Sequence, residues 1–111
     1  MRDFLHVDDV GAAFAALAGA ETIGAVNIGS GEGVAVRTFV EEIADAVGRR
    51  DLLDIGATPQ REGEPARLVA DVRRLRGEVS FTPAFGLRDG ISAAVSRLRR
   101  EMPAPRRVSS R

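Results

Sequence analysis

An uncharged stretch, residues 10–20, lies near the start of the chain. Its larger apolar side chains recur at helical spacing, and the positions between them hold glycine and alanine rather than charged residues. A helix that is small and apolar on every side is typical of one that is buried on several sides. The stretch therefore predicts a helix that needs packing partners on more than one face.

The segment before this helix predicts a short strand and a corner. Residues 2–7 alternate charged with apolar side chains, as a half-buried strand does. Asp8 and Asp9 follow, and either carboxylate can accept hydrogen bonds from the free N–H groups of a first helical turn. We therefore expect a strand, a tight corner and a helix capped by an aspartate.

Periodicity predicts further helices and strands along the rest of the chain. We expect helices at Val36–Val47 with Gly48 as a left-handed cap, at residues 71–77 with Asp71 as the cap, and at Leu87–Glu101. We expect short strands at residues 25–28 and 52–55, a brief extended run at 68–70, and helical ion pairs joining Arg37 to Glu41 and Asp45 to Arg49.

The two longer amphipathic helices each offer one apolar stripe, enough to cover one side of the helix at residues 10–20. The other side of that helix should face water in this chain. We therefore expect the isolated chain to be molten, self-associating or dye-binding. Residues 103–111, a tail of proline, serine and arginine with little apolar content, should be disordered.

A glycine cluster at residues 29–33 follows the expected strand and precedes a helix, the context of a dinucleotide-binding turn. The spacing does not fit, because the fingerprint G-x-G-x-x-G would need a glycine where Val34 stands. The cluster indicates a plain turn or a substrate-side loop instead.

Three motifs occur in an order that resembles a known family. They are Arg-Asp-Phe-Leu-His-Val-Asp-Asp at residues 2–9, Val-Asn-Ile-Gly-Ser-Gly at 26–31, and Arg-Glu-Gly-Glu at 61–64 leading to Ala-Asp at 70–71. They resemble the RDF(I/L)HVxD, (Y/F)NIGSG and RxGD…AD segments of the extended short-chain dehydrogenase/reductase (SDR) family, the NAD-dependent epimerases and dehydratases of nucleotide sugars. The resemblance covers roughly residues 2–100.

The chain lacks the residues with which that family performs redox chemistry. Tyrosine and lysine are absent, so the family's Tyr-x-x-x-Lys pair cannot form, and no glycine fingerprint is present. The resemblance then implies an α/β fold: residues 1–102 are the C-terminal, substrate-side portion of a Rossmann-type extended SDR, with three to four helices and a few short strands. NAD or NADP would bind the complete enzyme, whereas we expect this chain alone to bind no cofactor and to catalyse nothing.

Four residues match positions that hold the nucleotide sugar in the family. The resemblance assigns Arg61 and Arg2 to the diphosphate, Glu64 to the nucleotide ribose in place of the usual Asp, and Asn27 to the neighbourhood of the phosphates. An arginine fork does match diphosphate geometry. The structural alternatives are a solvated loop ion pair for Arg61 and Glu64, an ion pair with Asp3 for Arg2, and a buried amide for Asn27.

Other site classes are disfavoured. His6 is the single histidine and no cysteine is present, so we expect a packed or hydrogen-bonded histidine and no metal site. The balanced formal charge and the lack of aromatic residues among the C-terminal arginines disfavour a nucleic-acid partner. No stretch is long and apolar enough for a membrane span, and we expect a cytoplasmic protein.

Two functional hypotheses stay open from the sequence. The chain contributes nucleotide-diphosphate binding to an NAD(P)-dependent epimerase or dehydratase, with an N-terminal dinucleotide-binding half or a second copy as its partner. Alternatively, it is a stand-alone, non-catalytic module that binds nucleotide sugars or another protein.

Overall fold

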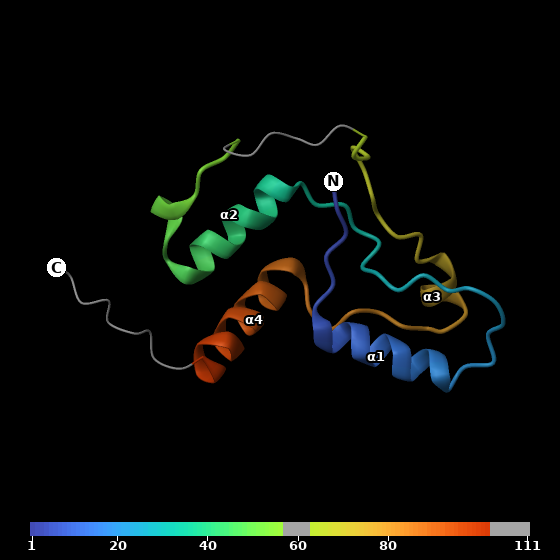
Figure 1. Cartoon of the computed structure of the whole chain (residues 1–111). Coiled ribbons are helices and arrows are strands. Elements are labelled where there is room, and N and C mark those ends of the chain that lie inside the picture. Colours follow the sequence, from blue (N-terminus) through green and yellow to red (C-terminus); the bar gives the residue numbers. More distant parts are fainter. Residues whose placement is uncertain (57–62, 103–111) are drawn as a thin grey trace.

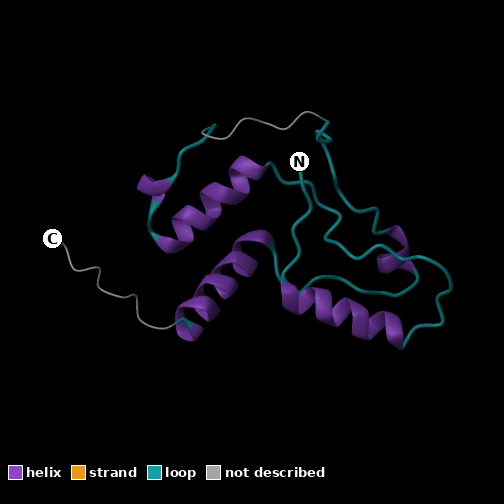
Figure 2. Cartoon of the chain, in the orientation of Figure 1, coloured by secondary structure: helices purple, strands orange, loops and turns teal. Residues whose placement is uncertain are grey.

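The computed structural model describes residues 1–56 and 63–102, and in this part of the chain it consists of helices joined by extended segments (Figures 1 and 2). The helices are α1 (Val7–Ala18), α2 (Val36–Val47), α3 (Arg73–Gly77) and α4 (Leu87–Glu101), with a 3-10 turn at Arg50–Leu52. Helices α2 and α4 pack side by side, and α1 lies with α3 in the other half of the molecule.

Helices α2 and α4 agree with the sequence prediction, whereas α3 begins at Arg73 and its N-cap is Val72 rather than the predicted Asp71. Helices α2 and α4 have the predicted bounds, and Gly48 adopts the predicted left-handed conformation at φ 71° and ψ 25°. Within α2, Arg37 pairs with Glu41 at 3.0 Å as predicted. The predicted pair of Asp45 with Arg49 is wrong: Asp45 binds Arg50 at 3.1 Å, because the chain turns at Gly48 and leaves Arg49 facing Asp51.

The start of α1 differs from the prediction in two ways. The helix begins at Val7, ahead of both aspartates, and the N-cap is His6, whose Nδ1 accepts a hydrogen bond from the Asp8 N–H at 3.0 Å. Neither Asp8 nor Asp9 caps the helix. Asp9 is buried instead, and its carboxylate accepts hydrogen bonds from the backbone N–H groups of Ala84 and Phe85 at 2.9 and 3.0 Å.

The predicted strands are wrong for the described residues, which contain no strand. Arg2 forms single β-bridges with Val34, antiparallel, and with Leu68, parallel. A regular strand needs ladder partners at successive residues, and residues 2–7 and 25–28 find none. Residues 52–55 begin at the end of the 3-10 turn and then reverse direction, so the α/β class is not realised in these segments.

The hydrophobic core is small and lies between α1, α3 and the loop that follows α3. Its buried members are Ala13, Val72, Leu75 and Phe81. Helix α1 turns only one side toward this core. Its outer face carries Val7 and Phe14, which are 66% and 59% exposed, so the water-facing side expected from the sequence is confirmed. The expectation that α2 and α4 cover the other side is wrong, because α3 and the loop that follows it cover that side.

The described helices include none that is long and apolar enough to cross a bilayer. The expected disordered tail, residues 103–111, lies outside the described residues.

Candidate functional site

The carboxylate of Asp3 ties together three segments that are far apart in the sequence. Its Oδ1 accepts hydrogen bonds from the Ser30 N–H at 2.8 Å and the Ser30 hydroxyl at 2.7 Å. Its Oδ2 accepts from the N–H groups of Gly31 at 2.9 Å and Ala70 at 3.2 Å. The N-terminal segment, the glycine cluster and the segment before α3 therefore meet at one side chain.

Burial and hydrogen bonding act in opposite directions on the pKa of Asp3. Desolvation raises it, whereas the Ser30 hydroxyl and the N–H groups of Ser30, Gly31 and Ala70 together hold it below its usual value. The ionised form is therefore the one that this site favours.

The glycine cluster has a steric reason to be glycine. A Cβ on Gly29 would lie 2.6 Å from the Cβ of Ala70, and one on Gly31, where φ is +77°, would lie 2.5 Å from a methyl group of Val72. These close approaches bring the cluster against the segment before α3. The sequence interpretation of the cluster as a turn is consistent with this packing.

Arg2 and Glu64, two of the predicted site residues, lie together. The Arg2 Nη1 donates hydrogen bonds to the backbone carbonyl oxygens of Met1 and Pro65, each at 2.9 Å. Its Nη2 lies 4.0 Å from a carboxylate oxygen of Glu64. The alternative pairing of Arg2 with Asp3 is not formed, because the Asp3 carboxylate is occupied by backbone N–H groups and Ser30.

Arg61, the residue that the resemblance assigns most directly to a diphosphate, lies outside the described residues. Gly63, two positions later, has φ +81°, a conformation that favours glycine. Glu64 is the first residue of the motif whose side-chain environment the structure gives.

Asn27 lies in a separate, polar depression. Its Nδ2 donates to the backbone carbonyl of Asp71 at 3.3 Å, and its side chain is exposed, so the alternative of a buried amide is wrong. The depression has a volume of about 410 Å³, and Arg2 and Glu64 do not line it. Its two arginines are already paired, Arg73 with Asp71 and Arg74 with Glu78.

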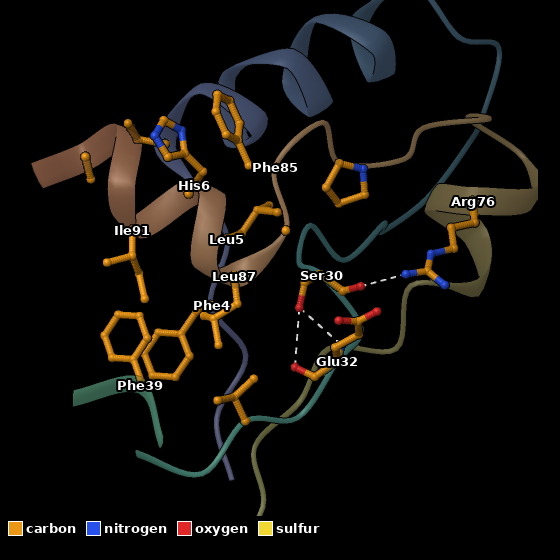
Figure 3. A pocket seen from close by; sticks show the side chains of 16 residues that line it. Phe4, Leu5, His6, Ser30, Glu32, Phe39, Arg76, Phe85, Leu87 and Ile91 are labelled. Carbon is orange, nitrogen blue, oxygen red and sulfur yellow. Dashed lines mark hydrogen bonds between the residues drawn. The ribbon is translucent and has the colours of Figure 1, made fainter. Parts of the chain in front are cut away.

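A larger pocket of about 450 Å³ is mainly apolar and lies between the N-terminal segment, the glycine cluster, α2 and the start of α4 (Figure 3). Its lining residues are Phe4, Leu5, His6, Val7, Ser30, Glu32, Val34, Phe39, Arg76, Pro83, Phe85, Gly86, Leu87, Gly90, Ile91 and Ala94. Sequence reasoning missed this pocket. The sequence patterns assigned its aromatic and aliphatic residues to the apolar faces of separate helices and strands. These residues come together only through tertiary packing.

His6 has the structural role that the sequence predicted. Besides capping α1, its ring stacks on Phe85 with the centroids 4.2 Å apart. Among the described residues, no group of three or more His, Cys, Asp or Glu side chains is arranged to hold a metal ion. The expectation that His6 is packed and hydrogen-bonded is confirmed.

Comparison with known proteins finds several similar sequences. The chain is 38% identical over 96 residues to GDP-L-fucose synthase 1 of Arabidopsis thaliana, an alignment that covers 83% of this chain and 28% of that protein. It is 32% identical over 97 residues to dTDP-glucose 4,6-dehydratase of Streptomyces griseus, covering 86% and 29%. It is 29% identical over 86 residues to UDP-glucose 4-epimerase of Corynebacterium glutamicum, covering 75% and 26%.

The chain thus spans less than a third of the length of these relatives. No family model matches the sequence, and no solved structure is significantly similar to it.

Proposed function

We propose that this chain forms the part of an NAD-dependent epimerase or dehydratase that binds the nucleotide diphosphate of a sugar substrate. Its sequence is homologous to one part of the sequences of that family. The names of three relatives contain three different nucleotides, GDP, dTDP and UDP. A binding role shared by all three must therefore rest on the common diphosphate. Arginine side chains are suited to that group.

The observation that carries this proposal is the meeting of Arg2 with the loop that contains Glu64. Two carbonyl oxygens hold one Arg2 nitrogen, and among the described residues no hydrogen-bond partner occupies Nε or Nη2. The Nε–H group therefore remains available to a phosphate oxygen, whereas Nη2 would exchange its ion pair with Glu64 for a phosphate. Arg61 precedes Glu64 by three positions, and the resemblance assigns it to the same diphosphate.

Binding, rather than catalysis, is the contribution that we propose for this chain. With no tyrosine and no lysine, it has no Tyr-x-x-x-Lys pair to move a proton at the sugar hydroxyl or to hold a nicotinamide ribose. NAD or NADP would be bound by a dinucleotide-binding part, which would also cover the exposed face of α1. The purified 111-residue chain is expected neither to bind NAD tightly nor to convert a nucleotide sugar.

The proposal is tested by calorimetry with GDP, UDP and dTDP, using the chain complemented by the dinucleotide-binding part of a relative. Arg2→Ala and Arg61→Ala should each weaken binding by about 1.5–3 kcal/mol, the scale of a charge-assisted hydrogen bond. Binding of NAD should be almost unchanged. The matched control is Arg88→Ala, because Arg88 is paired with Glu42 on the α2–α4 face and should not contribute.

Three outcomes would count against the proposal. Equal losses for the nucleoside diphosphates and NAD would indicate a structural role for the arginines. A loss as large in Arg88→Ala would indicate a nonspecific charge effect. Tight diphosphate binding by the isolated chain, with no gain from the dinucleotide-binding part, would favour the stand-alone module.

A further inference from the structure

The 450 Å³ pocket has aromatic walls supplied by separate parts of the chain (Figure 3). Phe4, from the N-terminal segment, stacks on Phe39 of α2 with ring centroids 3.6 Å apart and planes 6° apart. His6 and Phe85 form a second stacked pair, and Ile91 of α4 lies between the two pairs along the wall. A pocket of this size and apolar character is typical of sites that bury the body of a small organic molecule.

One edge of the pocket is polar and carries two charges of opposite sign, Arg76 and Glu32 (Figure 3). The Arg76 Nη2 donates to the backbone carbonyl of Ser30 at 2.7 Å. Within the described residues, no carboxylate lies within 4.0 Å of the Arg76 guanidinium, and no hydrogen bond or ion pair engages the Glu32 carboxylate. Arg76 is oriented by its hydrogen bond to Ser30, and no other described residue accepts a hydrogen bond from its guanidinium group.

We propose that this pocket binds a small aromatic molecule that carries both a carboxylate and an ammonium group. The aromatic body would be buried against the stacked rings, the carboxylate would pair with Arg76, and the ammonium group would pair with Glu32. A ligand with only a negative head would meet the Glu32 carboxylate, and one with only a positive head would meet Arg76. A dipolar head is the one that complements both charges.

This inference is independent of the nucleotide-diphosphate proposal, because Arg2, Glu64 and Asn27, the members of the proposed diphosphate site among the described residues, do not line the pocket. The two proposals can therefore fail separately.

The chain contains no tryptophan and no tyrosine, so indole fluorescence reports a bound ligand without background from the protein. We would titrate the 111-residue chain, at concentrations at which sedimentation shows a monomer, against fixed amounts of three probes and record fluorescence anisotropy. The probes are L-tryptophan, with a dipolar head, indole-3-propionate, with a negative head, and tryptamine, with a positive head. Tryptophan should bind saturably, with one site per chain, and more tightly than either of the other probes.

Two charge-neutralising variants test the two pairings separately. Arg76→Gln should weaken tryptophan binding by about tenfold and leave tryptamine binding no weaker. Glu32→Gln should weaken tryptophan binding by a similar factor and leave indole-3-propionate binding no weaker. Arg73→Gln is the matched control, because Arg73 is bound to Asp71 in the other depression and should not alter binding of any probe.

A third variant tests the pocket itself. Ala94 lines the pocket on α4, and Ala94→Phe should fill it and abolish binding of all three probes, while circular dichroism confirms retained helix. The proposal is overturned by no saturable binding of tryptophan, by tightest binding of indole-3-propionate or tryptamine, or by unchanged tryptophan affinity in both Arg76→Gln and Glu32→Gln.

Discussion

Asp3 and Ser30 are joined twice, since one carboxylate oxygen of Asp3 accepts both the backbone N–H and the hydroxyl group of Ser30. The other oxygen accepts the N–H groups of Gly31 and Ala70. The described part of the chain contains no strand. There the Asp3 carboxylate holds adjacent extended segments at a fixed distance, as the backbone hydrogen bonds of a β-ladder do in a sheet.

Asp3→Asn should therefore lower the free energy of unfolding by about 1–3 kcal/mol. In one orientation of the asparagine, its NH₂ group would face the N–H groups of Gly31 and Ala70, which are also donors. In the other orientation, it would face Ser30, and the hydrogen bond from the Ser30 N–H would be lost. Asp51→Asn is the matched control, because Asp51 is exposed and binds only the exposed Arg49, a pair worth at most about 1 kcal/mol. Urea denaturation measures both, and equal effects of the two variants would contradict the role assigned to Asp3.

The lowered pKa of Asp3 predicts a loss of stability in acid. Because the pKa is lower in the folded chain than in the unfolded chain, the contribution of Asp3 to stability is fully present above the unfolded value of 3.8. It is lost as the pH falls through the folded value. The fall in unfolding free energy between pH 5 and pH 2 should be smaller in Asp3→Asn than in the wild type.

A change of ionic strength distinguishes the contribution of Asp3 to stability from the contributions of the other acidic residues. Arginine side-chain hydrogen bonds also lower the pKa of four other carboxylates, those of half-buried Glu42 and of exposed Asp51, Asp71 and Glu78. Salt screens exposed ion pairs, whereas the Asp3 bonds to neutral N–H and hydroxyl groups are little affected. The difference between wild type and Asp3→Asn should therefore persist at 1 M salt, and its disappearance there would contradict this assignment.

Asp8 and Asp9 should differ sharply in their effect on stability although they are neighbours. Asp9 is 3% exposed and accepts the N–H groups of Ala84 and Phe85, so Asp9→Asn should cost about 1–3 kcal/mol. Asp8 is exposed, 3.5 Å from Arg97, and Asp8→Asn should cost less than about 1 kcal/mol. Thermal unfolding of the two variants measures this difference, and a reversed order would mean that Asp8 is the structural aspartate.

The features that the sequence predicted correctly are those encoded within one segment. Helix α2 has its apolar stripe and its stop signal, Gly48, inside some thirteen residues, so its bounds follow from periodicity and cap chemistry. The prediction of an aspartate cap for α1 was wrong. Two neighbouring aspartates gave equally good local signals, and the burial of Asp9 depends on its contact with Ala84, 75 residues away in the sequence.

The strands and the pocket depend on contacts between segments, and local patterns do not specify these. Residues 25–28 have a strand-like composition, but strand formation requires a partner in register, and here Asn27 reaches the Asp71 carbonyl through its side chain instead. The resemblance assigned Arg2 to the diphosphate and Glu64 to the ribose, and no local pattern predicted that the two side chains lie together. Arg76, in the arginine-rich helix α3, and Glu32, in the glycine cluster, were not singled out from the sequence because exposed charges in such segments are common.

The exposed face of α1 should make the isolated chain associate with itself. Val7 and Phe14 lie on this face with alanine and glycine between them, and no charged group interrupts the face after Asp8. Burial of apolar surface stabilises by about 25 cal/mol per Å², so covering a few hundred Å² would contribute several kcal/mol, comparable with the whole stability of a small domain. The chain should therefore show a concentration-dependent sedimentation coefficient and should bind a hydrophobic dye.

Phe14→Gln should reduce both the association and the dye fluorescence, because it places a polar group at the centre of that face. Leu98→Gln is the matched control: Leu98 is similarly exposed, at 55%, but belongs to α4 rather than to the face of α1, and its replacement should leave association unchanged. Adding the dinucleotide-binding part of a relative should suppress dye binding in the wild type if it covers the same face. A chain that remains monomeric at all concentrations and binds no dye would show that the face of α1 needs no partner, and would favour the stand-alone module over a portion of a larger enzyme.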